Sequence, residues 1–462
     1  MLSSFYSGLS GLSAHVVGMD VLGNNIANIN TIGFKASSPI FQDILSQSAG
    51  RSFDSGSQIG RGVCLGGISP SFSQGAFQNT DVATHLAIQG NGFFVLGDDS
   101  GDRYYTRAGN FVFDKEYDLV NPNGLSVLGW QTVTDTGVID TSGTASAIHL
   151  PIGMTMDPQA TTMFKTNINL DTEATVDNPS TSANEAEIFS TSLTTYDSLG
   201  AAHTITLEFT PIDENGDSIL DRWDWIAYVD ASEVDASSIG SGAGQLPPTA
   251  DGTGVIIARG DGDAAPTGNA ALDFEPMRFD SSGTLMSNTG LASLDFASVD
   301  WANGAEDQQV SWQVRSEADM DTTYLTGYSL TSAISYTYQD GVSVGEMESV
   351  VIRGDGTIIG QFSNGTTKAV AQIALATFPA PTSLTIMGEN LFGQAPGSGN
   401  PTIGTANTGG RGTMVGQTLE MANSDLTTQF TSMITMQRGF EANSKIITTA
   451  DEMIRQMLNL KR

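Results

Sequence analysis

Residues 419–458 read LEMANSDLTTQFTSMITMQRGFEANSKIITTADEMIRQML, and this stretch decides the architecture that the sequence predicts. An apolar residue returns at every seventh position, which is typical of a helix with one narrow apolar stripe. The stripe consists of Leu419, Leu426, Met433, Phe440, Ile447 and Ile454, with Phe430 and Leu458 on the second heptad position. We therefore expect a C-terminal helix over residues 417–460 whose stripe contacts another helix.

The start of the chain carries the same kind of pattern. Its stripe consists of Leu2, Phe5, Leu9, Leu12, Val16, Met19 and Ile26, and a glycine at position 23 interrupts it. We expect a helix from near residue 3 to about residue 29. Four interior glycines each cost about 0.5–1 kcal/mol relative to alanine, so this end should be disordered in the free protomer and become ordered on assembly. The two stripes are interpreted as a self-assembly seam.

An alternative buries both terminal helices against the chain's own β-domains, because an apolar stripe at helical spacing usually belongs to a core. The expected linker at residues 397–412 and the balanced charge of the C-terminal segment favour assembly instead. That segment, from residue 419 onward, contains five acidic and five basic residues.

Between the helices the pattern changes to period two, and turn residues multiply. The chain contains 52 Gly and 15 Pro. Residues 204–209, 223–229 and 310–314 are typical strands, and residues 197–200 and 213–216 are turn signals. Residues 231–270, rich in Ser, Gly, Ala and Asp, are expected to form surface loops or a flexible insertion. The middle of the chain is therefore predicted to be all-β.

Charge divides the chain further. It holds 51 acidic and 19 basic residues, a net charge of −32, which argues against binding nucleic acid. Residues 151–325 contain 29 acidic and 5 basic residues, a net of −24 (5 − 29). Because like charges repel, this stretch should face water while the neutral ends pack together.

The sequence offers little for catalysis, metal binding or membrane insertion. Cys64 is the single cysteine, and the four histidines lack metal-ligand spacing. Residues 261–263 (DGD) lack the distal glutamate of a calcium loop. No apolar run reaches 18 residues, and the N-terminus lacks the features of a signal peptide. We expect no enzyme activity, no cofactor and no membrane insertion.

Two RGD tripeptides, at residues 259–261 and 353–355, leave open a secreted acidic β-rich adhesin. Each is followed by Gly, which favours a tight hairpin turn over an adhesive loop.

Several segments resemble the bacterial flagellar rod and hook family. Residues 27–35 (ANINTIGFK) look like its N-terminal signature, and residues 437–443 (QRGFEAN) like its C-terminal counterpart. The motif residues are Asn28, Asn30, Thr31, Gly33, Phe34, Gln437, Arg438 and Asn443. Residues 87–94, 105–111 and 355–365 are similar to interior motifs of the same family. The match covers residues 1–130 and 325–462.

The resemblance implies a multidomain fold in which paired coiled-coil termini flank two mainly antiparallel all-β domains, the outer inserted in the inner. We expect an N-terminal helix in residues 1–35, an extended linker in 36–70, an inner β-domain in 71–147 plus 326–395, and an outer acidic β-domain in 148–325. A second linker in 396–416 and a C-terminal helix in 417–462 complete the division.

The function implied is that of a structural subunit of the flagellar hook, a flexible tube of identical copies that transmits torque from rod to filament. The implied partners are further copies, the distal rod, the hook cap, the hook–filament junction and the flagellar type III export proteins. A distal rod or junction subunit of the same family remains an alternative, although the acidic insertion favours the hook.

Overall fold

A computed structural model describes residues 2–44, 47–48, 58–98, 100–132, 138–150, 153–176, 186–214, 219–240, 245–261, 272–286, 292–316 and 322–460. The chain divides into two compact units. Unit 1 comprises Met1–Met154, Glu348–Gln361 and Thr367–Arg462, and unit 2 comprises Thr155–Met347 and Phe362–Thr366. The turn predicted at residues 213–216 and the acidic residues 261–263 lie partly outside the described residues.

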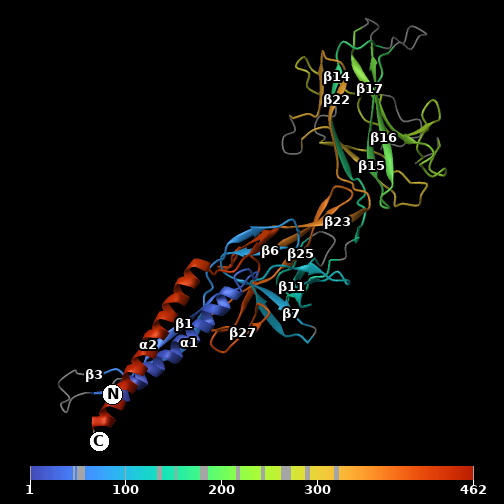
Figure 1. The fold of residues 1–462 in the computed structure, drawn as a ribbon. Helices are drawn as coiled ribbons and strands as arrows, with labels where there is room; N and C mark the ends of the chain where they lie inside the picture. Colours follow the sequence, from blue (N-terminus) through green and yellow to red (C-terminus); the bar gives the residue numbers. More distant parts are fainter. Residues whose placement is uncertain are drawn as a thin grey trace. The chain divides into compact units, whose positions relative to one another are not determined.

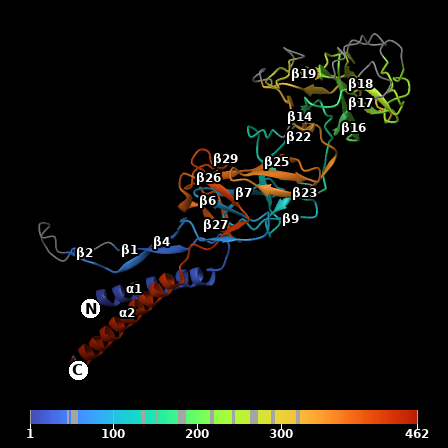
Figure 2. The same cartoon turned by 90° about the horizontal axis from the view of Figure 1, so that it is seen from above.

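Unit 1 begins and ends with the two predicted helices. Helix α1 spans Leu2–Ala27 and α2 spans Leu426–Leu460, and the two lie side by side (Figures 1 and 2). Asp425 caps the start of α2, because its carboxylate accepts a hydrogen bond of 2.7 Å from the Thr428 N–H. Hydrogen bonds from the backbone and the side chain of Thr428 hold the pKa of Asp425 below its usual value.

The C-terminal helix therefore starts later than the periodicity predicted. Leu419 does not belong to α2 but to strand β31 (Thr418–Glu420), which pairs with β5 (Phe77–Asn79). Leu419 lies seven residues before Leu426 by coincidence. A buried residue of a strand is as apolar as a residue on a helix stripe, so the pattern alone did not distinguish them. Leu419 is therefore a core residue of unit 1 and not part of the seam.

The predicted linker over residues 36–70 is a two-stranded ribbon. Strands β1 (Ser37–Asp43) and β4 (Val63–Pro70) pair antiparallel, and both contact α1 (Figure 2). A short pair, β2 (Gln47–Ser48) with β3 (Gln58–Ile59), belongs to the same stretch. The ribbon gives α1 a neighbour that the sequence did not indicate.

The rest of unit 1 is built on a large, mostly antiparallel sheet. Its central order is β23 (Gly345–Ile352), β24 (Thr357–Phe362), β25 (Thr367–Ile373), β11 (Ser126–Gln131), β7 (Phe93–Gly97), β8 (Arg103–Thr106), β28 (Leu391–Gly393) and β27 (Thr385–Gly388). Around it lie β9 (Val112–Phe113), β10 (Leu119–Val120), β12 (Ser146–Ala147), β26 (Leu375–Thr377), β29 (Thr402–Gly404) and the 3₁₀ turn η2 (Pro381–Ser383). An aromatic cluster that includes Phe93, Tyr105 and Phe378 fills this core.

The linker predicted for residues 396–416 is wrong, because this segment is part of the fold. Strand β29 pairs with β26, and β30 (Thr413–Gly416) pairs with β6 (Leu86–Gln89). Ala406 and Met414 are buried. Glycine-rich composition suggested a tether, whereas here several glycines supply the left-handed turns between short strands.

Unit 2 consists of two sheets around one apolar core. The first has the order β19 (Ser293–Asp295), β20 (Ser311–Gln313), β14 (Met163–Asp171) and β21 (Leu325–Tyr328), with β22 (Ala333–Gln339) also paired to β14. The second is β15 (Phe189–Tyr196), β16 (Ala202–Ile212), β17 (Arg222–Asp230) and β18 (Gly254–Gly260). A short strand, β13 (Thr155–Met156), pairs with β23.

The predicted strands at residues 204–209 and 223–229 are confirmed within β16 and β17, and residues 310–314 contain β20. Inward-facing residues alternate with outward ones, and Trp223, Trp225 and Trp312 form the centre of the core. The pairs of β14 with β20 and β21 are parallel, and the remaining ladders of unit 2 are antiparallel. The predicted boundary between the outer and inner β-domains at residue 325 is wrong, because it separates strand β21 from its partner β14.

We predict that a fragment of residues 71–424 unfolds at a higher urea concentration than one of residues 71–395. The shorter fragment lacks β29, β30 and β31, and therefore the buried side chains of Met414 and Leu419. Each such side chain contributes about 1.5–3 kcal/mol. Hydrogen exchange of the unit 1 strands at increasing urea concentration measures the two midpoints, and equal values would show that β29, β30 and β31 are not part of the inner fold.

Candidate self-assembly site

Helices α1 and α2 contact each other through small residues. A Cβ added to Gly8 would lie 3.2 Å from Cγ1 of Ile447, and one added to Gly11 would lie 2.7 Å from Nδ2 of Asn443. On the other helix, a Cβ added to Gly439 would lie 2.6 Å from the ring of His15. These glycines allow the two helices to approach closely, a role that sequence reasoning missed when it counted only their cost to the helix.

The buried face of α1 is not the predicted apolar stripe. Its buried residues are Gly8, Gly11, Ala14, Gly18, Leu22 and Asn25. Several of them precede a stripe residue by one position, and one position is a rotation of about 100° around a helix. The α1 residues that face α2 are therefore glycines beside the stripe and not the stripe itself.

The β1–β4 ribbon covers a second side of α1. The Asn25 side chain donates to the Ser37 carbonyl at 2.8 Å and accepts from the Ser37 N–H at 3.0 Å. The Ser10 hydroxyl accepts from the Val63 N–H at 3.2 Å. With α2 and the ribbon in place, the stripe forms the remaining face.

This remaining face is partly open. Leu9 is 46% exposed and Val16 is 38% exposed, and the polar residues Ser13 and Asp20 are exposed beside them. Phe5, Leu12, Met19 and Ile26 are half-buried, and the side chain of Leu2 lies outside the described residues. The exposed apolar side chains make this face a candidate interaction surface.

Helix α2 also leaves apolar side chains exposed. Met433, Phe440, Ile447 and Ile454 are half-buried, whereas Leu426, Phe430 and Leu458 are exposed. The heptad analysis missed four further exposed residues, Ile434, Ile446, Met453 and Met457. Of the C-terminal motif, Asn443 lies against α1, while Gln437 and Arg438 are exposed. The ion pair between Arg438 and Glu441 is exposed and contributes little.

A buried charge cluster joins the bases of the two helices to the sheet. Glu420, with a fully buried side chain, accepts from Lys35 Nζ at 2.6 Å and from Arg107 Nη1 at 3.3 Å. The Gly75 N–H donates to the same carboxylate at 2.9 Å. Burial lowers the pKa of the Lys35 ammonium, and the charge of Glu420 opposes that shift. We refer to Lys35, Arg107 and Glu420 as the junction cluster.

The N-terminal motif residues build the turn that delivers Lys35 to the cluster. Gly33 has a φ of +68°, and its N–H donates to the Glu420 carbonyl at 2.7 Å. A Cβ at this position would lie 2.4 Å from the Ala108 nitrogen, so only glycine fits. Asn28 accepts from the Thr31 hydroxyl at 3.2 Å, which closes the end of α1.

Two other motif residues have smaller roles. Phe34 is half-buried and Asn30 is exposed. Sequence reasoning missed Glu420 as a site residue, because it counted this charge only in the balance of the C-terminal segment. The available signal was the position of Glu420 directly after the apolar Leu419, where an acidic side chain would become buried and need a partner.

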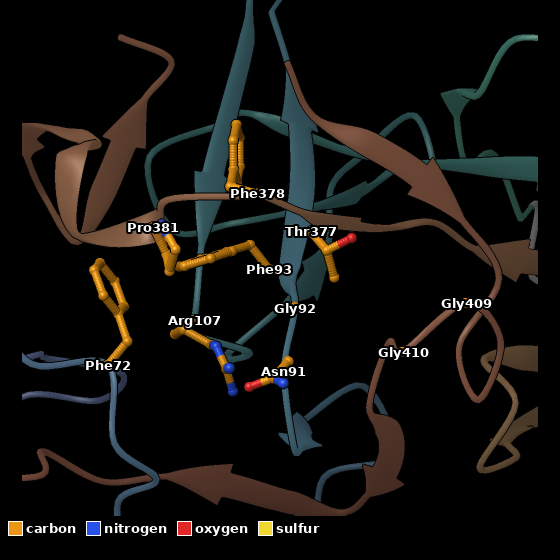
Figure 3. Close-up of a pocket in the computed structure, with 10 residues that line it drawn as sticks. All are labelled: Phe72, Asn91, Gly92, Phe93, Arg107, Thr377, Phe378, Pro381, Gly409 and Gly410. Carbon is orange, nitrogen blue, oxygen red and sulfur yellow. The ribbon is translucent and has the colours of Figure 1, made fainter. Parts of the chain in front are cut away.

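Unit 1 also contains a cavity of about 280 Å³ lined by three phenylalanines and Arg107 (Figure 3). The Arg107 guanidinium already donates to Glu420 and to the carbonyls of Ile88 and Gly90. The lining residues provide no nucleophile with an adjacent base. Nowhere in the described parts of the chain do three or more His, Cys, Asp or Glu side chains form a group that could hold a metal ion.

Neither described helix is both long enough and apolar enough to cross a lipid bilayer.

The RGD at residues 353–355 forms a tight turn between β23 and β24, as predicted. The Gly356 N–H donates to the Arg353 carbonyl at 2.9 Å, and the Asp355 carboxylate accepts from the Thr357 N–H at 3.0 Å. In the other RGD, Arg259 forms ion pairs with Asp261 and Asp273. In both tripeptides the aspartate has a structural partner, so nothing here favours an adhesive role.

Four family models match the chain in order. Flagella basal body rod protein matches residues 5–35, and flagellar hook protein FlgE/F/G D1 domain matches residues 87–176. Flagellar basal body protein FlaE D2 domain matches residues 167–342, and flagellar basal body rod FlgEFG protein C-terminal matches residues 415–460.

Full-length relatives agree with these matches. The chain is 35% identical to flagellar hook protein FlgE of Treponema pallidum and 33% identical to that of Borreliella burgdorferi, each over 100% of both chains. It is 31% identical to the Escherichia coli protein of the same name, over 99% of this chain and 100% of the relative. A crystal structure of Helicobacter pylori flagellar hook protein FlgE2 aligns with a TM-score of 0.47 at 16% identity, covering 74% of this chain and 100% of that one.

We predict that Glu420→Gln lowers the free energy of unfolding by about 3–5 kcal/mol, because two buried cations lose their carboxylate. Urea unfolding of the full chain measures this loss. Glu116→Gln is the control, since the Glu116 side chain is 59% exposed. Adding Lys35→Met to Glu420→Gln should restore part of the stability, and an unchanged midpoint in the single variant would contradict the role of the cluster.

A pair of glycine substitutions tests the helix contact. Gly23→Ala should stabilise α1 by about 0.5–1 kcal/mol, because an added Cβ meets nothing within 4 Å. Gly11→Ala should give no gain or a loss, since its Cβ would collide with Asn443. Thermal melting followed by circular dichroism compares the two, and equal gains would show that Gly11 is not in contact.

Proposed function

The chain belongs to the flagellar hook protein family, and we propose that it assembles through the exposed apolar residues on the stripes of α1 and α2. Members of this family are structural subunits of the hook and not enzymes. One observation carries this proposal. Leu9 and Val16 stay exposed on α1 although α2 and the β1–β4 ribbon both pack against this helix. In a polymer, the next copy supplies the missing cover.

The energetics favour this arrangement. Burying apolar surface contributes about 25 cal/mol of association free energy per Å². A few side chains on each helix therefore give a weak contact, which becomes stable when many copies repeat it in a polymer. Because α1 and α2 are in contact, both stripes lie on the same pair of helices. We propose that stripes of neighbouring copies meet as coiled-coil seams, with the glycine contact as the inner pairing.

We propose that unit 2 forms the outer acidic domain, inserted in the inner β-domain formed by unit 1. The support is that Thr155–Met347 lies within the sequence limits of unit 1 and has its own apolar core. This moves the proposed boundaries of the outer domain from 148–325 to 155–347. The polymer is a flexible tube that transmits torque, and acidic, hydrated outer surfaces allow contacts to slide as the tube bends.

The further partners follow from the family and stay proposals. They are the distal rod, the hook cap, the hook–filament junction and the flagellar type III export proteins.

We predict that Leu9→Asp abolishes tube formation at concentrations at which the unsubstituted chain polymerises. An unpaired charge in the seam and the lost apolar contact should raise the critical concentration more than about tenfold. Sedimentation and electron microscopy of purified protein measure it. Asn123→Asp is the control, because Asn123 is exposed in a turn of unit 1 outside both helices. Normal tubes from Leu9→Asp would contradict the assignment of the stripe.

A further inference from the structure

Unit 2 contains an open edge strand without charge. Strand β22 has the sequence Ala-Ile-Ser-Tyr-Thr-Tyr-Gln and pairs with β14 along one edge only among the described residues. Tyr336 is 49% exposed and Tyr338 is 41% exposed. Proteins usually protect such an edge with charges, proline or a cover, because it can recruit another chain. Here charge and proline are both missing from the strand.

The two tyrosines share a face with a lysine. In the β14–β22 ladder, Lys165 lies opposite Tyr338 and Asn167 lies opposite Tyr336, so these four side chains project from the same face of the sheet. Phe164, Thr166 and Ile168 alternate with them and are buried in the core. The four residues therefore lie on the outward side of the sheet, which also carries Asp171 of β14 and Asp295 of β19. We call the four residues the tyrosine face.

Lys165 differs from the other basic residues of unit 2. Arg222, Arg259 and Arg278 each pair with carboxylates of the same unit. Arg315 is buried and donates to the Leu285 carbonyl at 2.7 Å.

The Lys165 ammonium instead stands 4.9 Å from the ring centre of Tyr338 and 6.0 Å from that of Tyr324. Within the described ranges, no carboxylate pairs with it.

From these observations we infer that the tyrosine face binds a carboxylate-bearing surface of unit 2 from a second copy, with Lys165 pairing to the incoming carboxylate. This inference rests on the proposed assembly into a homopolymer. Neighbouring copies are equally acidic, so their outer units repel each other over most of their surfaces. Contact is favourable where one partner offers a cation that its own carboxylates leave unpaired, and among the described residues Lys165 meets this condition.

The chemistry of this contact suits a joint that bends. A lysine–carboxylate pair near the surface contributes little and is screened by salt, so single contacts can exchange. Tyrosines add apolar area together with hydroxyl groups that bond to water. The contact is therefore polar and reversible, unlike the apolar seam of the helices.

Zero-length cross-linking tests the inference. Purified full-length protein, half of it labelled with ¹⁵N, is polymerised and treated with a water-soluble carbodiimide, which joins an ammonium to a touching carboxylate as an amide. Mass spectrometry should find Lys165 joined to Asp or Glu of unit 2 in peptides of mixed isotope composition, in tubes but not in dilute protomers. Tubes without such peptides would overturn the inference. Failure of the unsubstituted chain to polymerise would instead overturn the proposed assembly and this inference with it.

A charge reversal provides the second measurement. Lys165→Glu should raise the critical concentration for polymerisation about three- to tenfold. The melting temperature of the protomer should fall only slightly, because the substitution removes the contacts of the ammonium with two tyrosine rings. Lys115→Glu, at a lysine whose side chain is 87% exposed in unit 1, is the matched control and should leave the critical concentration unchanged. Equal critical concentrations for the two variants would contradict the role of Lys165.

Discussion

A single buried carboxylate, Glu420, holds the two ends of this chain to the same β-fold. Lys35 follows the first helix, Arg107 comes from the sheet, and Glu420 precedes the second helix. A buried ion pair is a weak source of net stability, yet removing one partner leaves an uncompensated charge away from water. The cluster therefore acts mainly by excluding other arrangements. It fixes where both helices leave the sheet, and the direction of the assembly surface follows from that.

The glycines of α1 have two opposite effects. They weaken an isolated helix, and they also let α2 approach until Ile447 and Asn443 touch the α1 backbone face. Because α1 contributes small residues to the contact within the chain, its large apolar residues are left for the contact between chains that we propose. A conventional leucine seam inside one chain would have used up the surface that a polymer needs.

The molecule also separates apolar from polar contacts along the sequence. The helices at the ends carry balanced charge and exposed apolar side chains, whereas unit 2 is acidic and its arginines are engaged internally. A tube that bends at each revolution needs one contact that holds and another that slides. Apolar burial suits the first, and salt-screened, hydrated contacts suit the second.

The sequence by itself determined the terminal helices, the β-rich middle, the acidic stretch and the family, because these depend on local periodicity, composition and motifs. Only the tertiary structure decided which face of α1 is buried, since a rotation of about 100° separates Gly11 from Leu12 and periodicity alone does not say what lies beside a helix. It also moved Leu419 from helix to strand and turned the expected linker into β29 and β30. Strand pairing joins residues far apart in the chain, such as Leu419 with Gln78, and no local pattern encodes such partners.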